Sequence, residues 1–504
     1  MVAGGGDTPI TWRDVVHRGS DDLRARVALM PEEAWSRDPA ALVALAASYR
    51  SPGSTNPYAA DPYLDAAAEL LDTGAGDAPL RVLVPILRST SMRELGRFGD
   101  ARLLLADAAR ELGDARLPVA DRVELHALIL LGEGVCRMFA TDLEGARPAL
   151  LRALHVAEAR TPVSVQAEAS GCLALIELRT GSLRGADAHL ASASTAAARA
   201  QRTHPLSTAP MRLAAIAVAI EHGTADGLDA RLSALLAETA GTEYAPLALA
   251  ELAAAHESDD DGVIDVLQEL QLGIREWETP NLPRMLHDDS RIALLVQRHE
   301  AVAARAEIAR IEPDSAHTRC PATWSARLLL DAGEPAHAIE LIAPCLAMGD
   351  GHSPRTATLA TLVAASAHAL LGDHRTADAL FSRAITLAAP SGSVRPFGIL
   401  PRRQLTQLVS RAERASHPPA VEAVIAAIAE RYPSCDDTAP DTLSVRERLV
   451  LSRLLEGDTQ QRISFELSVS PNTIKTQVRS IYRKLGVSTR DGALQRARSL
   501  GLLE

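Results

Sequence analysis

The chain has 504 residues and a formal net charge of −12, from 64 acidic and 52 basic side chains. This length corresponds to about three domains of ordinary size, or to one long repeat array. The net charge excludes a surface that is positive throughout, as in proteins that bind nucleic acid or membranes over their whole extent. Aromatic residues make up 3% and hydrophobic residues 47% of the chain. Aliphatic side chains must therefore fill the core, which favours packed helices over β-sandwiches.

The cysteines and the N-terminus indicate the compartment. The five cysteines are widely spaced and form no CxxC pair, which argues against a disulfide framework. The first residues lack the basic and apolar regions of a secretory signal. No apolar stretch reaches the roughly 18 residues that span a bilayer. We therefore predict a cytoplasmic protein without a membrane partner.

Residues 1–20 are an N-terminal segment and a candidate for disorder, and residues 21–431 form a predicted helical array. In the array, an apolar helix repeatedly ends in a small polar turn and an Ala-rich helix follows. The turns fall at Asp142, Gly181, Gly223, Gly333 and Gly372, with spacings of 39, 42, 110 and 39 residues. The long gap has room for two weaker repeats, around Asp261 and Glu300. This pattern predicts stacked helical hairpins, because Gly supplies the positive φ that ends a first helix.

The array resembles tetratricopeptide-like repeats, although its period exceeds the usual ~34 residues and most aromatic signature positions are absent. The resemblance implies an all-α solenoid whose concave surface binds a small-molecule or protein effector. A globular all-α domain without true repeats is the alternative.

The pattern changes near Pro390. Residues 389–397 are expected to be a loop, followed by helices over 400–414 and 420–431. Residues 432–442 are rich in Pro and acidic side chains and lack hydrophobic periodicity, so they are a predicted interdomain linker.

Residues 443–504 contain the start and stop signals of four short helices. Polar N-cap residues precede each helix, Pro471 lies in the first turn of the third, and Glu447 and Asp491 complete capping boxes. The expected helices begin at Ser444, Thr459, Ser470 and Ser488 and end at Gly457, Leu467, Gly486 and about Leu500.

A helical projection separates the third helix into two faces. The apolar face consists of Ile474, Val478, Ile481 and Leu485, and the opposite face of Asn472, Lys475, Thr476, Arg479 and Arg483. Basic, amide and hydroxyl side chains can bind base edges in the DNA major groove. The second helix, a three-residue turn and the third helix match the helix-turn-helix arrangement. If the polar face of the third helix is considered alone, an ordinary solvent-exposed helix surface is the simpler interpretation.

Further residues of the segment follow a known pattern. They are Leu443, Arg446, Glu447, Val450, Leu451, Gly457, Ile463, Leu467, Val469, Ser470, Thr473, Ile474, Lys475, Ile481, Tyr482, Lys484, Leu485, Gly486, Val487, Arg490, Ala493, Leu500, Gly501 and Leu502. On these residues the segment resembles the LuxR-type helix-turn-helix domain. Ser464 stands where the family usually has Ala, and Gln477 where it usually has His. DNA binding is expected to survive both departures, with an altered preference at Gln477.

The resemblance implies roles for individual residues. Lys475, Thr476 and Arg479 would read bases of double-stranded promoter DNA. Contacts to the DNA backbone or flanking positions would come from Asn472, Thr473, Gln477, Arg483 and Lys484. Ala493, Leu494 and Ala497 of the fourth helix would form the contact of a homodimer on inverted half-sites. RNA polymerase is a further candidate partner, and the location would be the nucleoid within the cytoplasm.

The distribution of charge supports this interpretation. Residues 441–504 hold 11 basic and seven acidic side chains, a net charge of +4, and the rest of the chain has a net charge of −16. Both lysines of the chain, Lys475 and Lys484, lie in the third helix.

The order of parts also resembles the C-terminal portion of MalT-like large LuxR regulators, with Arg395, Pro396 and Phe397 as the specific residues. Those regulators carry a nucleotide-binding module. This sequence has no GxxxxGK[ST] motif and no lysine before residue 475. We therefore expect neither ATP nor another cofactor.

Other chemistries have little support. The segment 257–262 resembles a calcium loop, but Gln268 occupies the position where an acidic residue is required. His317 and Cys320 are three residues apart, and nothing nearby in the sequence completes a metal site. With no GxSxG motif either, we predict no enzyme and no metal site.

We therefore expect a sequence-specific, DNA-binding transcriptional regulator whose helical array senses an effector or partner. The alternative is a helical-repeat interaction scaffold with a secondary DNA-binding domain, suggested by the length and negative charge of the array.

Overall fold

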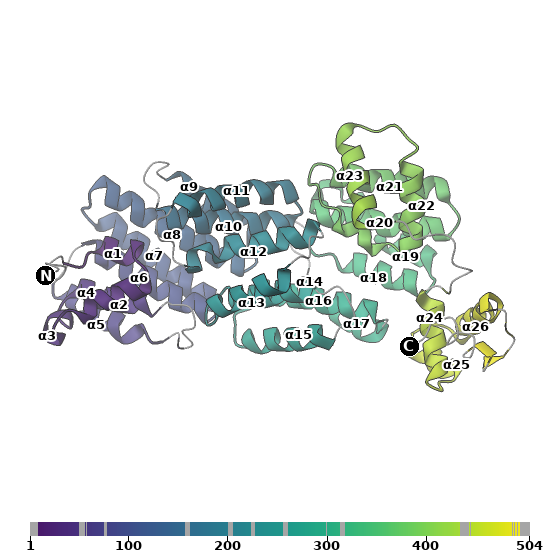
Figure 1. The fold of residues 1–504 in the computed structure, drawn as a ribbon, viewed down its shortest axis with the longest axis horizontal. Helices are drawn as coiled ribbons and strands as arrows, with labels where there is room; N and C mark the ends of the chain where they lie inside the picture. Colours follow the sequence, from purple (N-terminus) through teal and green to yellow (C-terminus); the bar gives the residue numbers. More distant parts are fainter. Residues whose placement is uncertain are drawn as a thin grey trace. The chain divides into compact units, whose positions relative to one another are not determined.

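The computed structural model describes residues 9–49, 56, 58–74, 78–156, 162–199, 205–222, 227–255, 261–298, 300–312, 318–433, 443, 445–485, 487, 489–490 and 492–493. In these residues every regular element is a helix, as the all-α prediction requires (Figure 1). The chain divides into two compact units, residues 1–179 with 183–290 and residues 180–182 with 291–504. None of the described helices combines the length and apolar character that crossing a bilayer requires.

The first unit is a succession of helices in which neighbours along the chain pack together, such as α6 with α7 and α8 with α9. Its helices are α1 (Trp12–His17), α2 (Ser20–Ala28), α3 (Glu32–Trp35), α4 (Pro39–Ser48), α5 (Asp61–Asp72), α6 (Ala78–Glu94), α7 (Phe98–Asp114), α8 (Val119–Phe139), α9 (Leu143–His155), α10 (Val163–Thr180), α11 (Leu183–Arg199), α12 (Pro205–His222), α13 (Leu228–Thr239), α14 (Ala245–Ala255) and α15 (Asp261–Gly273). Helix α16 (Leu282–Gln297) crosses the boundary between the units.

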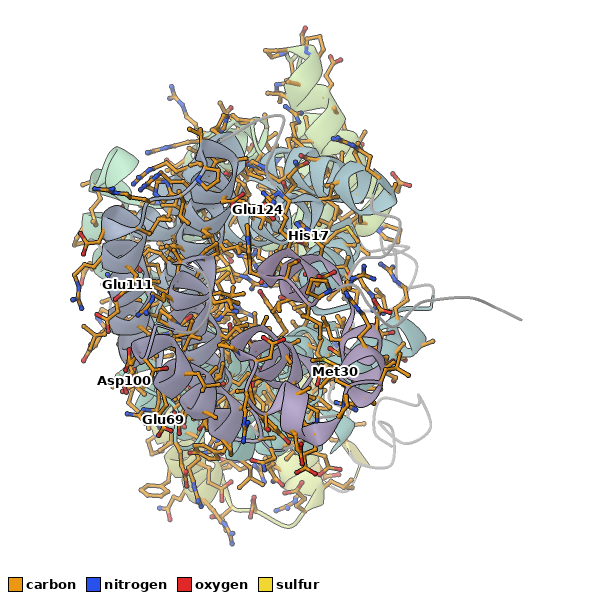
Figure 2. The ribbon with its side chains drawn as sticks, turned by 90° about the vertical axis from the view of Figure 1, so that its left-hand side faces the viewer. His17, Met30, Glu69, Asp100, Glu111 and Glu124 are labelled. Atoms are coloured by element: carbon orange, nitrogen blue, oxygen red, sulfur yellow. The ribbon has the colours of Figure 1, made fainter. Side chains whose placement is uncertain are left out.

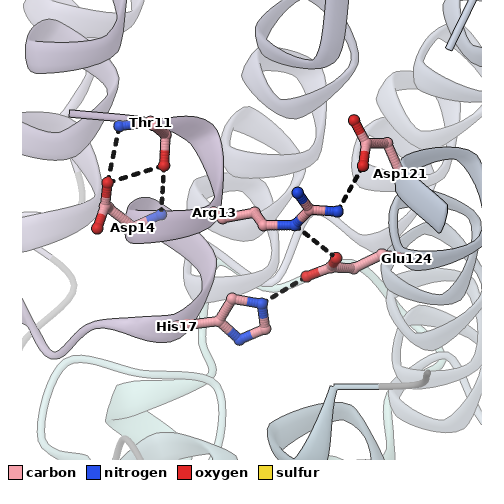
Figure 3. Close-up of polar contacts among 6 residues, drawn as sticks. All are labelled: Thr11, Arg13, Asp14, His17, Asp121 and Glu124. Carbon is pink, nitrogen blue, oxygen red and sulfur yellow. Dashed lines mark hydrogen bonds and ion pairs between the residues drawn. The ribbon is translucent and has the colours of Figure 1, made fainter. Parts of the chain in front are cut away.

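Helix α1 lies within the predicted N-terminal segment, of which residues 1–8 are outside the described part of the chain. Thr11 caps it through a reciprocal pair of bonds with Asp14, and Trp12 is buried. Arg13 forms ion pairs with Asp121 and Glu124 of α8, and His17 Nε2 lies 2.5 Å from Glu124 Oε1 (Figure 3). Figure 2 looks onto this end of the unit, where His17 and Glu124 lie side by side. The sequence gives no sign of these contacts, because they join residues more than 100 positions apart.

The second unit contains shorter helices. They are α17 (Ala301–Ile308), α18 (Pro321–Asp331), α19 (Pro335–Ala347), η1 (Gly349–Gly351), α20 (Pro354–Leu370), α21 (His374–Ala388), η2 (Arg395–Ile399), α22 (Arg402–Ala412), α23 (Pro419–Arg431), α24 (Val445–Leu455), α25 (Gln460–Glu466) and α26 (Pro471–Leu485).

The expected turns of the array lie between helices. Asp142 caps α9 by accepting a bond from the Gly145 amide, 2.9 Å away. Gly181, Gly333 and Gly372 have φ values of +92°, +80° and +81°, each between two helices. Gly223 lies outside the described residues. Helical hairpins are therefore present at these turns, and the class of repeat stays a prediction.

The region after Pro390 differs from the expected loop. Arg395–Ile399 form the 3-10 helix η2, and Phe397 packs edge-on against Phe381 with 5.7 Å between ring centroids. Tyr432, expected as the first linker residue, donates its hydroxyl to the Arg395 carbonyl, 2.9 Å away. Tyr432 therefore belongs to the packed unit, and residues 434–442 lie outside the described part.

Candidate nucleic-acid interface

Helices α24, α25 and α26 pack around one small apolar core. The four residues of the expected stripe, Ile474, Val478, Ile481 and Leu485, are all buried there. They meet Val450, Leu451, Leu454, Ile463 and Leu467 from the other two helices and the turn after α25. This packing fixes which face of α26 is turned outward.

Two of the predicted N-caps are present. Thr459 Oγ1 accepts a bond from the Arg462 amide at 3.2 Å, and Ser470 Oγ accepts one from the Thr473 amide at 3.1 Å. Pro471 is the first residue of α26, where a missing N–H costs little. Ser444, Gly486, Ser488 and Asp491 lie outside the described residues.

The turn between α25 and α26 is short and held from both sides. Ser468 has a positive φ of 52°, and the Val469 amide donates to the Ser464 carbonyl at 3.0 Å. Arg446 of α24 donates to the Leu467 carbonyl at 3.3 Å. This carbonyl lies at the C-terminal end of α25, where unpaired carbonyls carry partial negative charge and a cation is therefore favourable. The buried Ser464 hydroxyl donates to the Gln461 carbonyl at 2.7 Å, which satisfies the polar group where the family usually has Ala.

The three predicted base-reading residues share the outward face of α26. Lys475, Thr476 and Arg479 are exposed, and so is Asn472 in the first turn. The Thr476 hydroxyl donates to the Asn472 carbonyl at 2.9 Å, which leaves its methyl group and lone pairs for another molecule. Neither Lys475 nor Arg479 forms an ion pair with a described residue, so both charges remain available to a polyanion.

The expected flanking contacts are in less open positions. Thr473 is half-buried, with its hydroxyl 2.7 Å from that of Ser470, so it also serves the helix cap. Gln477 is half-buried, and its Oε1 is covered without a hydrogen-bond partner among the described residues. The side chain of Arg483 lies outside the described part of the structure.

Lys484 has a partner that sequence reasoning missed. Its Nζ lies 2.7 Å from Oε2 of Glu447, whose side chain is 7% exposed. Arg490 donates to the Leu454 carbonyl at the end of α24. For the Lys484–Glu447 pair, the signal available in the sequence was the acidic Glu447 at an inward-facing position of α24. In this structure Lys484 joins α26 to α24, and its expected contact with the DNA backbone stays a prediction.

The start of the fourth helix is described only in part. Thr489 Oγ1 accepts a bond from the Gly492 amide at 3.1 Å, so Thr489 caps the helical residues Gly492 and Ala493. Ala493 is completely buried in the core of its own domain, so its side chain is not available for the expected dimer contact. Leu494 and Ala497 lie outside the described residues.

Comparison with known proteins agrees with this geometry. Residues 441–497 match the family described as bacterial regulatory proteins, luxR family. Two relatives, each named "Probable transcriptional regulatory protein NarL", come from Mycobacterium tuberculosis strains CDC 1551 / Oshkosh and ATCC 25618 / H37Rv. Each is 47% identical over 62 residues, which are 12% of this chain and 29% of the relative. The similarity therefore concerns one end of this chain and less than a third of each relative. Residues 441–497 form a helix-turn-helix domain of the luxR family.

Proposed function

We propose that the protein is a sequence-specific transcriptional regulator that binds promoter DNA through α26. The observation that carries the proposal is that Lys475 and Arg479 are exposed, and form no ion pair with a described residue, on a helix whose opposite face is buried. Both belong to the segment that matches the luxR family. Such a helix can enter the major groove while its partner helix crosses the backbone.

The spacing of the two cations suits base readout. Lys475 and Arg479 are four residues apart, so they stand about 6 Å apart along the helix axis. Two base-pair steps of B-DNA cover about 6.8 Å. Each cation therefore reaches a different base pair, where a guanine offers its two major-groove acceptors. Thr476 lies between them and offers its methyl group to thymine.

The remaining polar residues would set the register on the backbone. Asn472, Thr473 and Gln477 lie along the first two turns of α26, whose N-terminal amides also attract phosphate. Arg483 is the further expected backbone contact. We propose that the protein binds inverted half-sites as a homodimer through the fourth helix, with Leu494 and Ala497 as contacts in place of Ala493.

We further propose that the helical array is tetratricopeptide-like and senses an effector, in the manner of the MalT-like regulators. Its long run of helical hairpins and its negative charge support the binding of a small molecule or a protein there. RNA polymerase is the expected partner at the promoter.

The test is DNA selection with the full-length protein, followed by titration of the selected site and a scrambled site. We expect preferential binding of the selected site and a steep decrease of affinity with salt, because bound counterions are released from the DNA. Lys475→Ala and Arg479→Ala should each remove most of the preference. Recovery of a stoichiometric protein partner together with equal affinity for both DNAs would instead favour an interaction scaffold.

A further inference from the structure

Three potential metal ligands meet in the interior of the second unit. Cys320 is the N-cap of α18, Cys345 lies in the last turn of α19, and His352 follows η1 at the entrance to α20. All three are buried, with exposed fractions of 4%, 8% and 6%. One ligand atom of each lies within 4.8 Å of the others. Sequence spacing did not show this, because 25 and seven residues separate the three positions.

The separation of the two sulfurs fits a shared metal ion. Cys320 Sγ lies 3.5 Å from Cys345 Sγ. Two thiolates at about 2.3 Å from a tetrahedral zinc ion stand roughly 3.8 Å apart. A disulfide bond requires about 2.05 Å, so the two sulfurs are not bonded in this structure. Small side-chain rotations would bring both sulfurs and the imidazole to coordinating distance.

The surrounding helices hold the three residues in place. Helices α18, α19 and α20 pack on one another, and both cysteines belong to their shared apolar core. Thr356 Oγ1 donates to the Thr318 carbonyl at 3.0 Å, which ties the first turn of α20 to the segment before Cys320. Ser353 Oγ, next to His352, accepts from the Thr356 amide at 3.3 Å. The site therefore has a fixed frame, as a preorganised metal site requires.

From this juxtaposition we infer that Cys320, Cys345 and His352 bind a thiophilic metal ion, with Zn²⁺ as the ion that the ligand set favours. Two thiolates and one imidazole match zinc, and three protein ligands leave the fourth tetrahedral position to water or an added ligand. Binding would release a proton from each thiol to solvent and form two metal–sulfur bonds and one metal–nitrogen bond. The ion would then link three helix ends. This site is independent of the proposed DNA binding.

The experiment uses full-length protein, reduced, freed of metal by a chelator and kept without oxygen. Co²⁺ serves as the spectroscopic probe, because thiolate coordination gives sulfur-to-cobalt charge-transfer bands and tetrahedral ligand-field bands. We expect one Co²⁺ per chain and its displacement by Zn²⁺. Cys320→Ser, Cys345→Ser and His352→Gln should each weaken the affinity at least tenfold. Cys136→Ala, a buried thiol of the other unit, and Cys435→Ser should leave the titration unchanged.

A second measurement needs no variant and so remains decisive if a substituted chain does not fold. Zn²⁺ should slow the alkylation of Cys320 and Cys345, followed by peptide mass spectrometry, and should leave the rate at Cys136 and Cys172 unchanged. Zn²⁺ should also raise the melting temperature, since a ligand that binds only the folded state stabilises it. Equal alkylation rates with and without Zn²⁺, or a Cys320–Cys345 disulfide in protein that takes up no metal, would overturn the proposal.

Discussion

Nζ of Lys484, one of the two lysines in the chain, lies 2.7 Å from the buried carboxylate of Glu447. The pair joins the last turn of α26 to the first turn of α24. Loss of a partly buried, charged hydrogen bond destabilises a protein more than loss of a surface ion pair does. The reason is that the remaining partner stays buried without water or a counter-charge. The orientation of α26 therefore depends on a residue for which the sequence predicts a phosphate contact.

We predict that Lys484→Met destabilises the C-terminal domain by about 2 kcal/mol, the typical cost of a stranded buried charge. Hydrogen exchange of the α24 and α26 amides in the full-length protein measures this loss locally. Glu447→Gln should have a similar effect, and the double variant should lose less than the sum of the two. Additive losses would show that the two side chains do not interact.

DNA titration separates this positioning role from a phosphate contact. A lysine that neutralises a phosphate contributes about one unit to the slope of log affinity against log salt. For Lys484→Met we expect weaker binding with an unchanged slope. A slope lower by about one unit would instead show that Lys484 contacts a phosphate, as the sequence predicts.

Lys475→Ala and Arg479→Ala should each cost about 1–3 kcal/mol of binding to the preferred site. Both side chains are exposed, so the melting temperature should stay within about 1 °C of the original value. Arg448→Ala is the matched control, since it removes an exposed cation of α24. This control can weaken binding to all DNA, but it should leave the ratio of specific to non-specific affinity unchanged.

Gly96 is expected to tolerate no side chain. It has a φ of +69°, and a Cβ there would lie 2.1 Å from Cγ of Trp277. The backbone conformation costs about 1 kcal/mol for Ala, and forced overpacking adds about 1–3 kcal/mol. Gly96→Ala should therefore lower the free energy of unfolding of the first unit by about 3 kcal/mol in urea titrations. Gly74→Ala is the matched control, because its φ is +87° with open space around the site, and it should cost about 1 kcal/mol.

The contrast between Gly96 and Gly372 shows what the sequence could predict. The turn at Gly372 follows from local signals, a glycine after an apolar helix and a capping Asp373 before the next one. The same kind of local signal gave the caps at Thr459 and Ser470 and the buried stripe of α26. The role of Gly96 depends on Trp277, 181 residues later, which no periodicity reveals. The Lys484–Glu447 pair and the group of Cys320, Cys345 and His352 are likewise products of tertiary packing.

Alkaline pH should destabilise the first unit through its buried thiols. Burial raises the pKa of Cys136 to about 12, and burial also raises the pKa of Cys172, whose sulfur lies 4.0 Å from the Tyr244 hydroxyl. An unfolded chain loses these protons near pH 8.5, while the folded chain keeps them. The folded state therefore binds more protons above that pH, and its stability decreases as pH rises towards 12, by up to about 1.4 kcal/mol per pH unit for each thiol.

Urea titrations at pH 8, 9 and 10 measure this slope. A Trp324→Phe background leaves the fluorescence to the three tryptophans of the first unit. Cys136→Ala should give a shallower decrease than the parent chain, and a stability that stays constant between pH 8 and 10 would contradict the burial of both thiols.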